Sequence, residues 1–232
     1  MLPIRDINPR TRAVPVTRSL IVINIAVFML QVFALALGTP PPWLPFAFVP
    51  DAFFSNPWAY ALTPLTAAFL HGSAAHLIGN LFFLYVFGDN VEARLGSVRF
   101  AAFYLAAAVA SALAHGALQP SSLTPMVGAS GPISAVLAAY LVWYPGRRVQ
   151  AMLIPLLPAY LLMRLVGRVP PFHLWWFPAW LFLGYWAVVQ LIEATGSVTP
   201  GRLDGAGVAW WAHVGGFAFG LATVALTSRK HR

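Results

Sequence analysis

Three short polar stretches interrupt an otherwise apolar chain, and their residue types suit a serine hydrolase. One contains Ser130, a candidate nucleophile, and another contains His213, a candidate base. The third contains His76 and Asn80, whose side chains can donate hydrogen bonds to an oxyanion. Polar and ionisable groups are costly inside a bilayer, so by default they indicate function there. The combination predicts a serine hydrolase that works within the membrane.

Ser130 lies between Gly128 and Gly131, at the predicted start of a helix. The N-terminus of a helix presents free N–H groups and partial positive charge, which suit a developing oxyanion. Serine is a weak nucleophile unless an adjacent base takes its proton. Taken alone, Gly-x-Ser-Gly is explained more simply by a helix cap with close packing.

His213 is followed by Gly216 and Gly220, which form a Gly-x-x-x-Gly spacing. That spacing lets two transmembrane helices approach closely. We therefore expect the helix of His213 to pack against the helix of Ser130 and bring the two side chains within hydrogen-bond reach. The alternative is a buried histidine that forms a hydrogen bond across helices without any catalytic role.

His76 and Asn80 are four residues apart, so they share one helix face and could together form an oxyanion hole. His71 lies near the expected membrane edge and is predicted to support the preceding loop. A three-histidine metal site is the rival interpretation. The chain has no His-Glu-x-x-His motif and no cysteine, and we expect no metal or other cofactor.

The acidic residues decide between a catalytic dyad and a triad. The chain has six of them, and none is evidently placed to orient His213. We therefore predict a Ser–His dyad. Asp89, Glu92 and Arg94 are expected to form a structural cluster at the inner end of the second span.

Composition indicates an all-α membrane protein. Of 232 residues, 59% are hydrophobic and 9% are charged, against about 25% charged in a soluble domain. Because a helix needs about 20 apolar residues to cross the hydrocarbon core, we predict six spans. They cover residues 19–37, 71–91, 99–117, 130–145, 175–193 and 207–227.

The basic residues predict that both termini are cytoplasmic. The net charge is +8, but the charges lie at the ends of apolar runs, where they set orientation, so no nucleic-acid partner is expected. With the N-terminus inside, only Arg202 of the 14 basic residues falls outside. Spans two, four and six then run inward and place His76, Ser130 and His213 at a similar depth in the outer half of the membrane.

This topology predicts three segments. Residues 1–18 form a basic cytoplasmic N-terminus, 19–227 the membrane domain that carries the candidate hydrolase site and 228–232 a basic cytoplasmic tail. We expect the first helix to be retained rather than removed as part of a signal peptide, and we expect the protein to reside in the cell membrane.

Two segments are harder to interpret. Residues 149–163 are apolar but short, with arginines on both flanks, and we interpret them as a re-entrant or interfacial segment rather than a seventh span. Residues 38–70 form a long outer connection rich in proline and aromatic residues. It either lies in the outer interface of the membrane or packs on the bundle as an ordinary hydrophobic loop.

The chain resembles the rhomboid family of intramembrane serine proteases. The matching stretches, in order, are His71-GSAA-His76-LIG-Asn80, Gly88-DNV-Glu92-A-Arg94-LG, Gly128-A-Ser130-G and Ala212-His213-VGGFAF-Gly220. The resemblance implies a six-helix bundle with Ser130 as nucleophile and His213 as general base and acid. It also implies that His76, Asn80 and the Ser130 backbone N–H form the oxyanion hole, and that the substrates are transmembrane proteins in the lipid bilayer.

One departure concerns the residue four positions after the serine. Many members of the family have a tyrosine there that stacks on the base histidine, whereas this chain has Ser134. Either His213 is freer or another aromatic residue fills the space. Two other functions remain open: a catalytically silent rhomboid-like protein that binds membrane clients, and a transporter, although no internal repeat is evident. The oligomeric state stays open.

Overall fold

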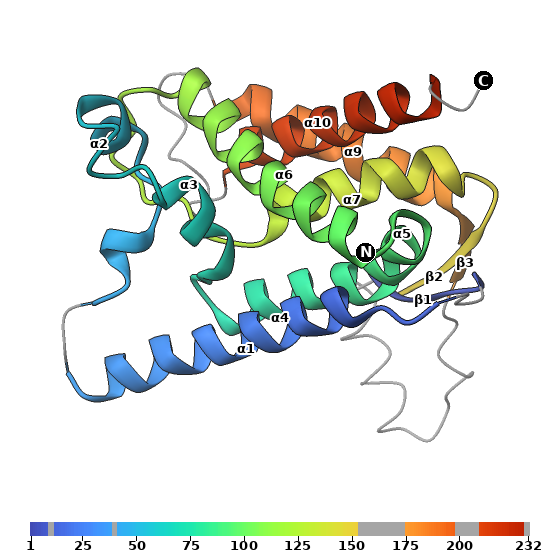
Figure 1. Cartoon of the computed structure of the whole chain (residues 1–232), viewed down its shortest axis with the longest axis horizontal. Helices are drawn as coiled ribbons and strands as arrows, with labels where there is room; N and C mark the ends of the chain where they lie inside the picture. Colours follow the sequence, from blue (N-terminus) through green and yellow to red (C-terminus); the bar gives the residue numbers. More distant parts are fainter. Residues whose placement is uncertain (9–11, 39–40, 153–174, 198–208, 230–232) are drawn as a thin grey trace, which may run out of the picture.

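Helices make up 70% of the residues that the structure describes, and the long helices lie roughly along one direction (Figure 1). The computed structural model describes residues 1–8, 12–38, 41–152, 175–197 and 209–229. Its main helices are α1 (Pro15–Ala36), α4 (Ala74–Phe83), α5 (Asp89–Leu95), α6 (Ser97–Leu118), α7 (Ser130–Trp143), α9 (Ala179–Ser197) and α10 (Trp210–Arg229). A π-helical turn, η3 (Leu84–Gly88), joins α4 to α5.

Helix α7 is the centre of the bundle. All residues from Gly131 to Tyr140 are buried, and the helix contacts α6, α9 and α10. It ends at Trp143, two residues before Pro145, because the residue before a proline is disfavoured in helical geometry. The expected span 130–145 therefore corresponds to a helix of 14 residues, which is short for a membrane crossing.

Helix α10 approaches α7 closely through two glycines. A Cβ at Gly216 would collide with the carbonyl oxygen of Gly131, and one at Gly220 would collide with the carbonyl oxygen of Ala135. Gly215 faces α6 in the same way, where a Cβ would overlap Ala114. The absence of side chains at these positions sets the separation between the helices.

A three-stranded antiparallel sheet lies at one end of the bundle, a feature that the expectation of an all-α protein missed. Its strands are β1 (Leu2–Asp6), β2 (Arg148–Met152) and β3 (Trp175–Pro178), in that order. Leu2 pairs with Met152, and Arg148 pairs with Pro178. The pairing joins segments far apart in sequence, so local periodicity gave no sign of it.

The sheet corrects two predicted boundaries. The apolar run 149–163, which we interpreted as re-entrant or interfacial, begins as strand β2, and residues 153–163 lie outside the described part. The span expected at 175–193 begins as strand β3, and its helix starts only at Ala179. The backbone N–H of Ala179 donates to the carbonyl of Arg147 at 2.7 Å, which ties the start of α9 to the strand region.

The connection between α1 and α4 is built from short helical pieces. They are η1 (Leu44–Phe46), α2 (Pro50–Ser55), α3 (Thr63–Thr66) and η2 (Ala67–Phe69). Phe48 is fully buried and its backbone pairs with Met126, so this part packs on the bundle. Trp58 and Leu62 are largely exposed on the same connection. The burial of Phe48 fits a loop that packs on the bundle, and a position in the outer interface of the membrane stays a prediction.

Asp89, Glu92 and Arg94, which we predicted to form a structural cluster, all lie on α5 and make contacts that stabilise the fold. The Glu92 carboxylate accepts hydrogen bonds from the backbone N–H groups of Val16 and Thr17, at 3.0 and 2.7 Å, and so caps α1. Asp89 accepts from the Asn90 side chain at 2.8 Å. The guanidinium of Arg94 lies 4.9 Å from the ring centroid of Trp143.

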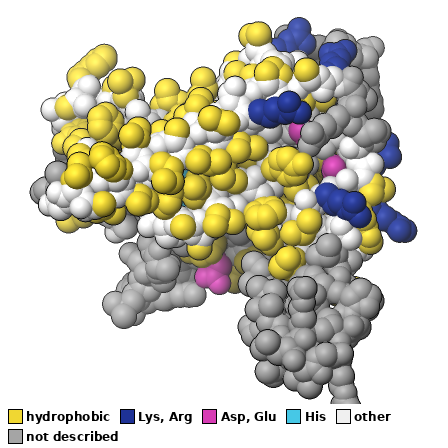
Figure 2. All heavy atoms as spheres, turned by 90° about the horizontal axis from the view of Figure 1, so that it is seen from below, with side chains coloured by type: hydrophobic (Ala, Val, Ile, Leu, Met, Phe, Trp, Pro, Cys, Tyr) yellow, Lys and Arg dark blue, Asp and Glu magenta, His cyan; other side chains and the backbone are white. Residues whose placement is uncertain are grey.

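The described surface has the character of a membrane protein. Helices α1 and α6 are long and apolar enough to cross a membrane, and a bent pair covering Thr63–Phe69 and Ala74–Leu95 could form a third span. Helices α7, α9 and α10 are also apolar, but their described apolar parts are shorter than a full membrane span. Seen from the α1 side, apolar side chains cover much of the surface, and basic side chains gather at the end that carries the sheet (Figure 2).

The α7–α10 packing predicts the effect of adding one methyl group. Gly220→Ala should lower the unfolding free energy by about 1–3 kcal/mol, because the Cβ overlaps Ala135 in a packed core. Thermal unfolding of the purified protein measures this. Gly184→Ala on α9 is the matched control, since a Cβ there meets nothing within 4 Å. Equal stability of the two variants would contradict the packing argument.

Asp6 forms a polar cluster where β1 meets the bundle. Its carboxylate accepts hydrogen bonds from the Tyr140 hydroxyl at 2.5 Å and from the Asn90 side chain at 2.9 Å. Burial raises the pKa of Asp6 from 3.8 to about 6. The hydrogen bond from Tyr140 opposes that rise in pKa, and the negative charge of Asp89 adds to it.

This raised pKa predicts a pH dependence of stability. Because folding favours the protonated form, the contribution of Asp6 to stability is full below about pH 4 and is lost as the pH rises through about 6. Asp6→Asn should remove this part of the fall in melting temperature between pH 4 and 7. Asp51→Asn, at the other end of the molecule, should keep the wild-type slope. An unchanged slope in Asp6→Asn would contradict the assignment.

Candidate active site

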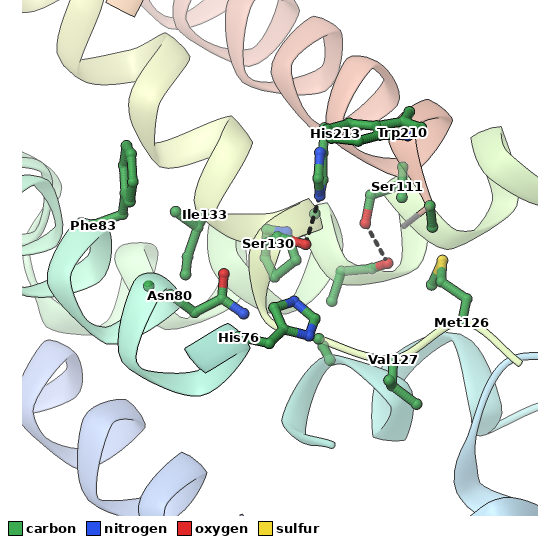
Figure 3. A pocket seen from close by; sticks show the side chains of 18 of the residues that line it. His76, Asn80, Phe83, Ser111, Met126, Val127, Ser130, Ile133, Trp210 and His213 are labelled. Atoms are coloured by element: carbon green, nitrogen blue, oxygen red, sulfur yellow. Dashed lines mark hydrogen bonds between the residues drawn. The ribbon is translucent and has the colours of Figure 1, made fainter. Parts of the chain in front are cut away.

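The polar residues singled out in the sequence line one cavity of about 580 Å³. Three helices contribute them from their first turns or just beyond: α4 provides His76 and Asn80, α7 provides Ser130, and α10 provides His213. Figure 3 shows Ser130 between His213 on one side and the pair His76 and Asn80 on the other. The structure thus brings together the side chains of all four predicted residues.

Ser130 and His213 are in direct contact. The Ser130 Oγ lies 2.7 Å from Nε2 of His213, which is hydrogen-bond distance (Figure 3). Ser130 is the first residue of α7, so its backbone N–H has no acceptor within the helix. Gly131, the next residue, faces Ser111 of α6, where a Cβ would overlap the Ser111 side chain. The small residue therefore lets α6 lie against the first turn that carries the serine.

His213 also contacts an amide that the sequence analysis missed. Its Nδ1 lies 2.6 Å from Oε1 of Gln190 on α9. Both side chains are buried, with exposed fractions of 9% and 8%. The prediction of a dyad rested on the absence of a suitably placed carboxylate and left uncharged partners of His213 aside. Gln190 could have been found in the sequence as a polar residue within an apolar helix, because such residues often have a function in membrane proteins.

Two tryptophans surround the imidazole. The ring of Trp186, one turn before Gln190 on α9, has its centroid 6.2 Å from that of His213 at an interplanar angle of 38°. Trp210 on α10 meets the imidazole edge-on at 5.7 Å. Ser134 takes no part in this packing, because its hydroxyl donates to the carbonyl of Ser130 at 2.6 Å. The aromatic neighbours of the histidine therefore come from α9 and α10.

His76 is held by its helix cap and by a glycine opposite. The Ser73 Oγ accepts a hydrogen bond from the His76 backbone N–H at 3.1 Å, which caps α4. This cap starts the helix at Ala74, later than the predicted start of the span at residue 71. Gly128 has φ of 125°, and a Cβ there would lie 2.5 Å from Cε1 and 2.7 Å from Nε2 of His76. The imidazole occupies the space that any other residue at 128 would fill.

Asn80 is held by His71, so His71 supports a side chain of the site and not only the loop. The Asn80 Nδ2 donates to Nε2 of His71 at 3.0 Å, and the rings of His71 and His76 are 5.2 Å apart. The Gln31 side chain on α1 contacts both the N–H and the carbonyl of the His71 backbone, at 3.0 and 3.3 Å. Because an amide nitrogen has two hydrogens, Asn80 keeps one for a ligand in the cavity.

The arrangement contains the parts needed for acyl transfer. A hydroxyl is bonded to an imidazole nitrogen that can take its proton. The first residue of α7, whose N–H has no acceptor within the helix, lines the same cavity as two side chains that can donate hydrogen bonds.

Comparisons with known proteins indicate the family of this chain. The Rhomboid domain family model matches residues 59–230. The Rhomboid protease GlpG of Klebsiella pneumoniae is 31% identical over 215 residues, which are 92% of this chain and 63% of that protein. The Presenilin-associated rhomboid-like protein A, mitochondrial, of Danio rerio is 31% identical over 114 residues, which are 47% of this chain and 30% of that protein. The chain thus spans less than two thirds of the length of each of these relatives.

The match of the family model over most of the chain, together with these relatives, shows that the chain belongs to the rhomboid family of multi-pass membrane proteins.

Proposed function

We propose that this protein is an intramembrane serine endopeptidase that cleaves transmembrane proteins by a Ser130–His213 dyad. The observation that carries the proposal is the 2.7 Å contact between Ser130 Oγ and His213 Nε2 inside a cavity lined by potential oxyanion donors. The similarity to a rhomboid protease over 92% of the chain supports the same reaction class.

The first step is acylation of the serine. Nε2 of His213 accepts the Ser130 proton as Oγ attacks the scissile carbonyl carbon, and the resulting imidazolium then protonates the leaving amine. Water next attacks the acyl-enzyme with His213 again as base, which releases the second product and restores the hydroxyl. Serine and histidine thus return to their starting protonation states.

The oxyanion formed at each stage needs preorganised donors. His76, the free N–H of Asn80 and the Ser130 backbone N–H are the groups proposed for this role. His71 and Gln31 hold Asn80 in place, and Gly128 leaves room for the His76 ring. These donors are aligned before the substrate binds, so little reorganisation is needed when charge develops.

We also propose that both termini are cytoplasmic and that six helical segments span the membrane, with cleavage near the outer face. The start of β1 and the end of α10 lie at the same end of the molecule, which supports a common side for the termini (Figure 1). Basic residues gather there, in line with the positive-inside rule (Figure 2). Residues 1–18 and 228–232 would then be cytoplasmic flanks of a protease domain formed by residues 19–227.

Substitution of the dyad tests the proposal directly. In liposomes with a single-span reporter protein, Ser130→Ala and His213→Ala should both abolish cleavage, because nucleophile and base are lost. A serine-reactive fluorophosphonate should label the wild type and leave Ser130→Ala unlabelled. Cleavage that persists in Ser130→Ala would contradict the mechanism. Reporter binding without cleavage or labelling would instead favour a catalytically silent client-binding protein.

Gly128 offers a test of the oxyanion site. Gly128→Ala should displace the His76 ring and reduce reporter cleavage by about 10²-fold, the typical effect of losing one oxyanion donor. Gly146→Ala is the matched control, since a Cβ there meets nothing within 4 Å and should leave cleavage unchanged. Wild-type cleavage by Gly128→Ala, with a wild-type melting temperature, would exclude His76 from this role.

A further inference from the structure

Gln190 places an amide oxygen against the nitrogen of His213 that does not face the serine. Oε1 of Gln190 lies 2.6 Å from Nδ1, while Nε2 of the same ring lies 2.7 Å from Ser130 Oγ. The three side chains therefore form a continuous hydrogen-bonded row from α9 through α10 to α7. Gln190 also lines the cavity, and its side-chain oxygen contacts the imidazole of His213 rather than Ser130.

The direction of these hydrogen bonds determines which ring nitrogen carries the proton. A neutral imidazole has one N–H and one bare nitrogen, and the partner of one nitrogen fixes the state of the other. An amide oxygen can only accept, so Nδ1 must carry the hydrogen. Nε2 is then bare and able to accept the Ser130 proton. The opposite tautomer would point an N–H at the serine and block general-base catalysis.

Gln190 and Trp186 lie four residues apart, so they share one face of α9. The Trp186 ring lies beside the imidazole, with centroids 6.2 Å apart, and the amide hydrogen bond restricts rotation of the imidazole about its Cβ–Cγ bond. Unlike a carboxylate, the amide brings no charge into a buried helix interface, where an ion would be costly. It therefore acts mainly on ring geometry and tautomer.

We propose that Gln190 is a positioning residue that holds His213 in the Nδ1-protonated tautomer and keeps Nε2 available to Ser130. The inference rests on the proposed protease function. It assigns to an uncharged side chain of α9 the orienting role that a carboxylate has in a serine-protease triad.

Kinetics of two variants test this role in the full-length protein in liposomes. Gln190→Met has a similar length but a poor acceptor, and it should lower kcat by about 10- to 100-fold with KM within about twofold, since a misplaced base costs rate rather than binding. Gln190→Glu retains an acceptor oxygen and should restore kcat to within about tenfold of wild type. Asn24→Leu removes a buried amide on α1 and should keep wild-type kcat.

The tautomer is measured independently of cleavage. In protein labelled with ¹⁵N-histidine, the His213 signal, identified by its loss in His213→Asn, should report a protonated Nδ1 and a bare Nε2. Gln190→Met should shift this signal toward the other tautomer, and Gln190→Glu should retain the wild-type pattern. Melting temperatures of all variants show whether each one is folded.

The outcomes separate this inference from the proposed function. Wild-type kcat and tautomer in folded Gln190→Met would overturn the positioning role. Equally slow Gln190→Met and Gln190→Glu with an unchanged tautomer would also overturn it, because only packing would then be affected. A wild-type protein that does not cleave, or a Ser130→Ala variant that does, would instead overturn the protease mechanism, and the ¹⁵N signal would still decide what Gln190 does to the ring.

Discussion

The close approach of α10 to α7 is the constraint on which the site depends. Gly216 and Gly220 bring the two backbones together where a methyl group would collide with the carbonyls of Gly131 and Ala135. Two apolar helices gain little from the hydrophobic effect in lipid, so such packing must supply the contact. His213 lies one turn before Gly216, and Ser130 lies next to Gly131. The glycine contact therefore sets the 2.7 Å distance between the two functional atoms.

Helix starts explain why the remaining groups converge. Ser130 is the first residue of α7, and His76 and His213 lie in the first turns of α4 and α10. N–H groups at a helix start lack acceptors within the helix, so their partners must come from caps or from ligands. Ser73 satisfies the N–H of His76 on α4, whereas Ser130, the first residue of α7, lines the cavity and has no acceptor for its N–H within its own helix. The same structural position thus serves stability in one helix and chemistry in another.

Residues that stand out from their immediate sequence neighbours could be predicted, whereas contacts between distant segments could not. Ser130, His213, His76 and Asn80 were marked by polarity in apolar segments, and Gly216 and Gly220 by their spacing. The sheet depends on pairing between Leu2 and Met152, which no local period reveals. Gln190 was missed because it is uncharged, whereas the prediction considered only acidic residues as partners of His213. Interhelical contacts in an apolar bundle favour uncharged partners, since an amide is less costly to bury than a carboxylate.

Ser130 and His213 are held in place by different helices. Ser130 is fixed by α7 and by the close contact of Gly131 with Ser111 on α6. The imidazole receives its amide and one of its two indole contacts from α9, which carries Gln190 and Trp186 on one face. With Ser134 bonded back to its own helix, α7 adds no aromatic side chain to this packing. A shift of α9 relative to α7 would therefore change the orientation of the base while leaving the nucleophile in place, so the two members of the pair depend on different helix contacts.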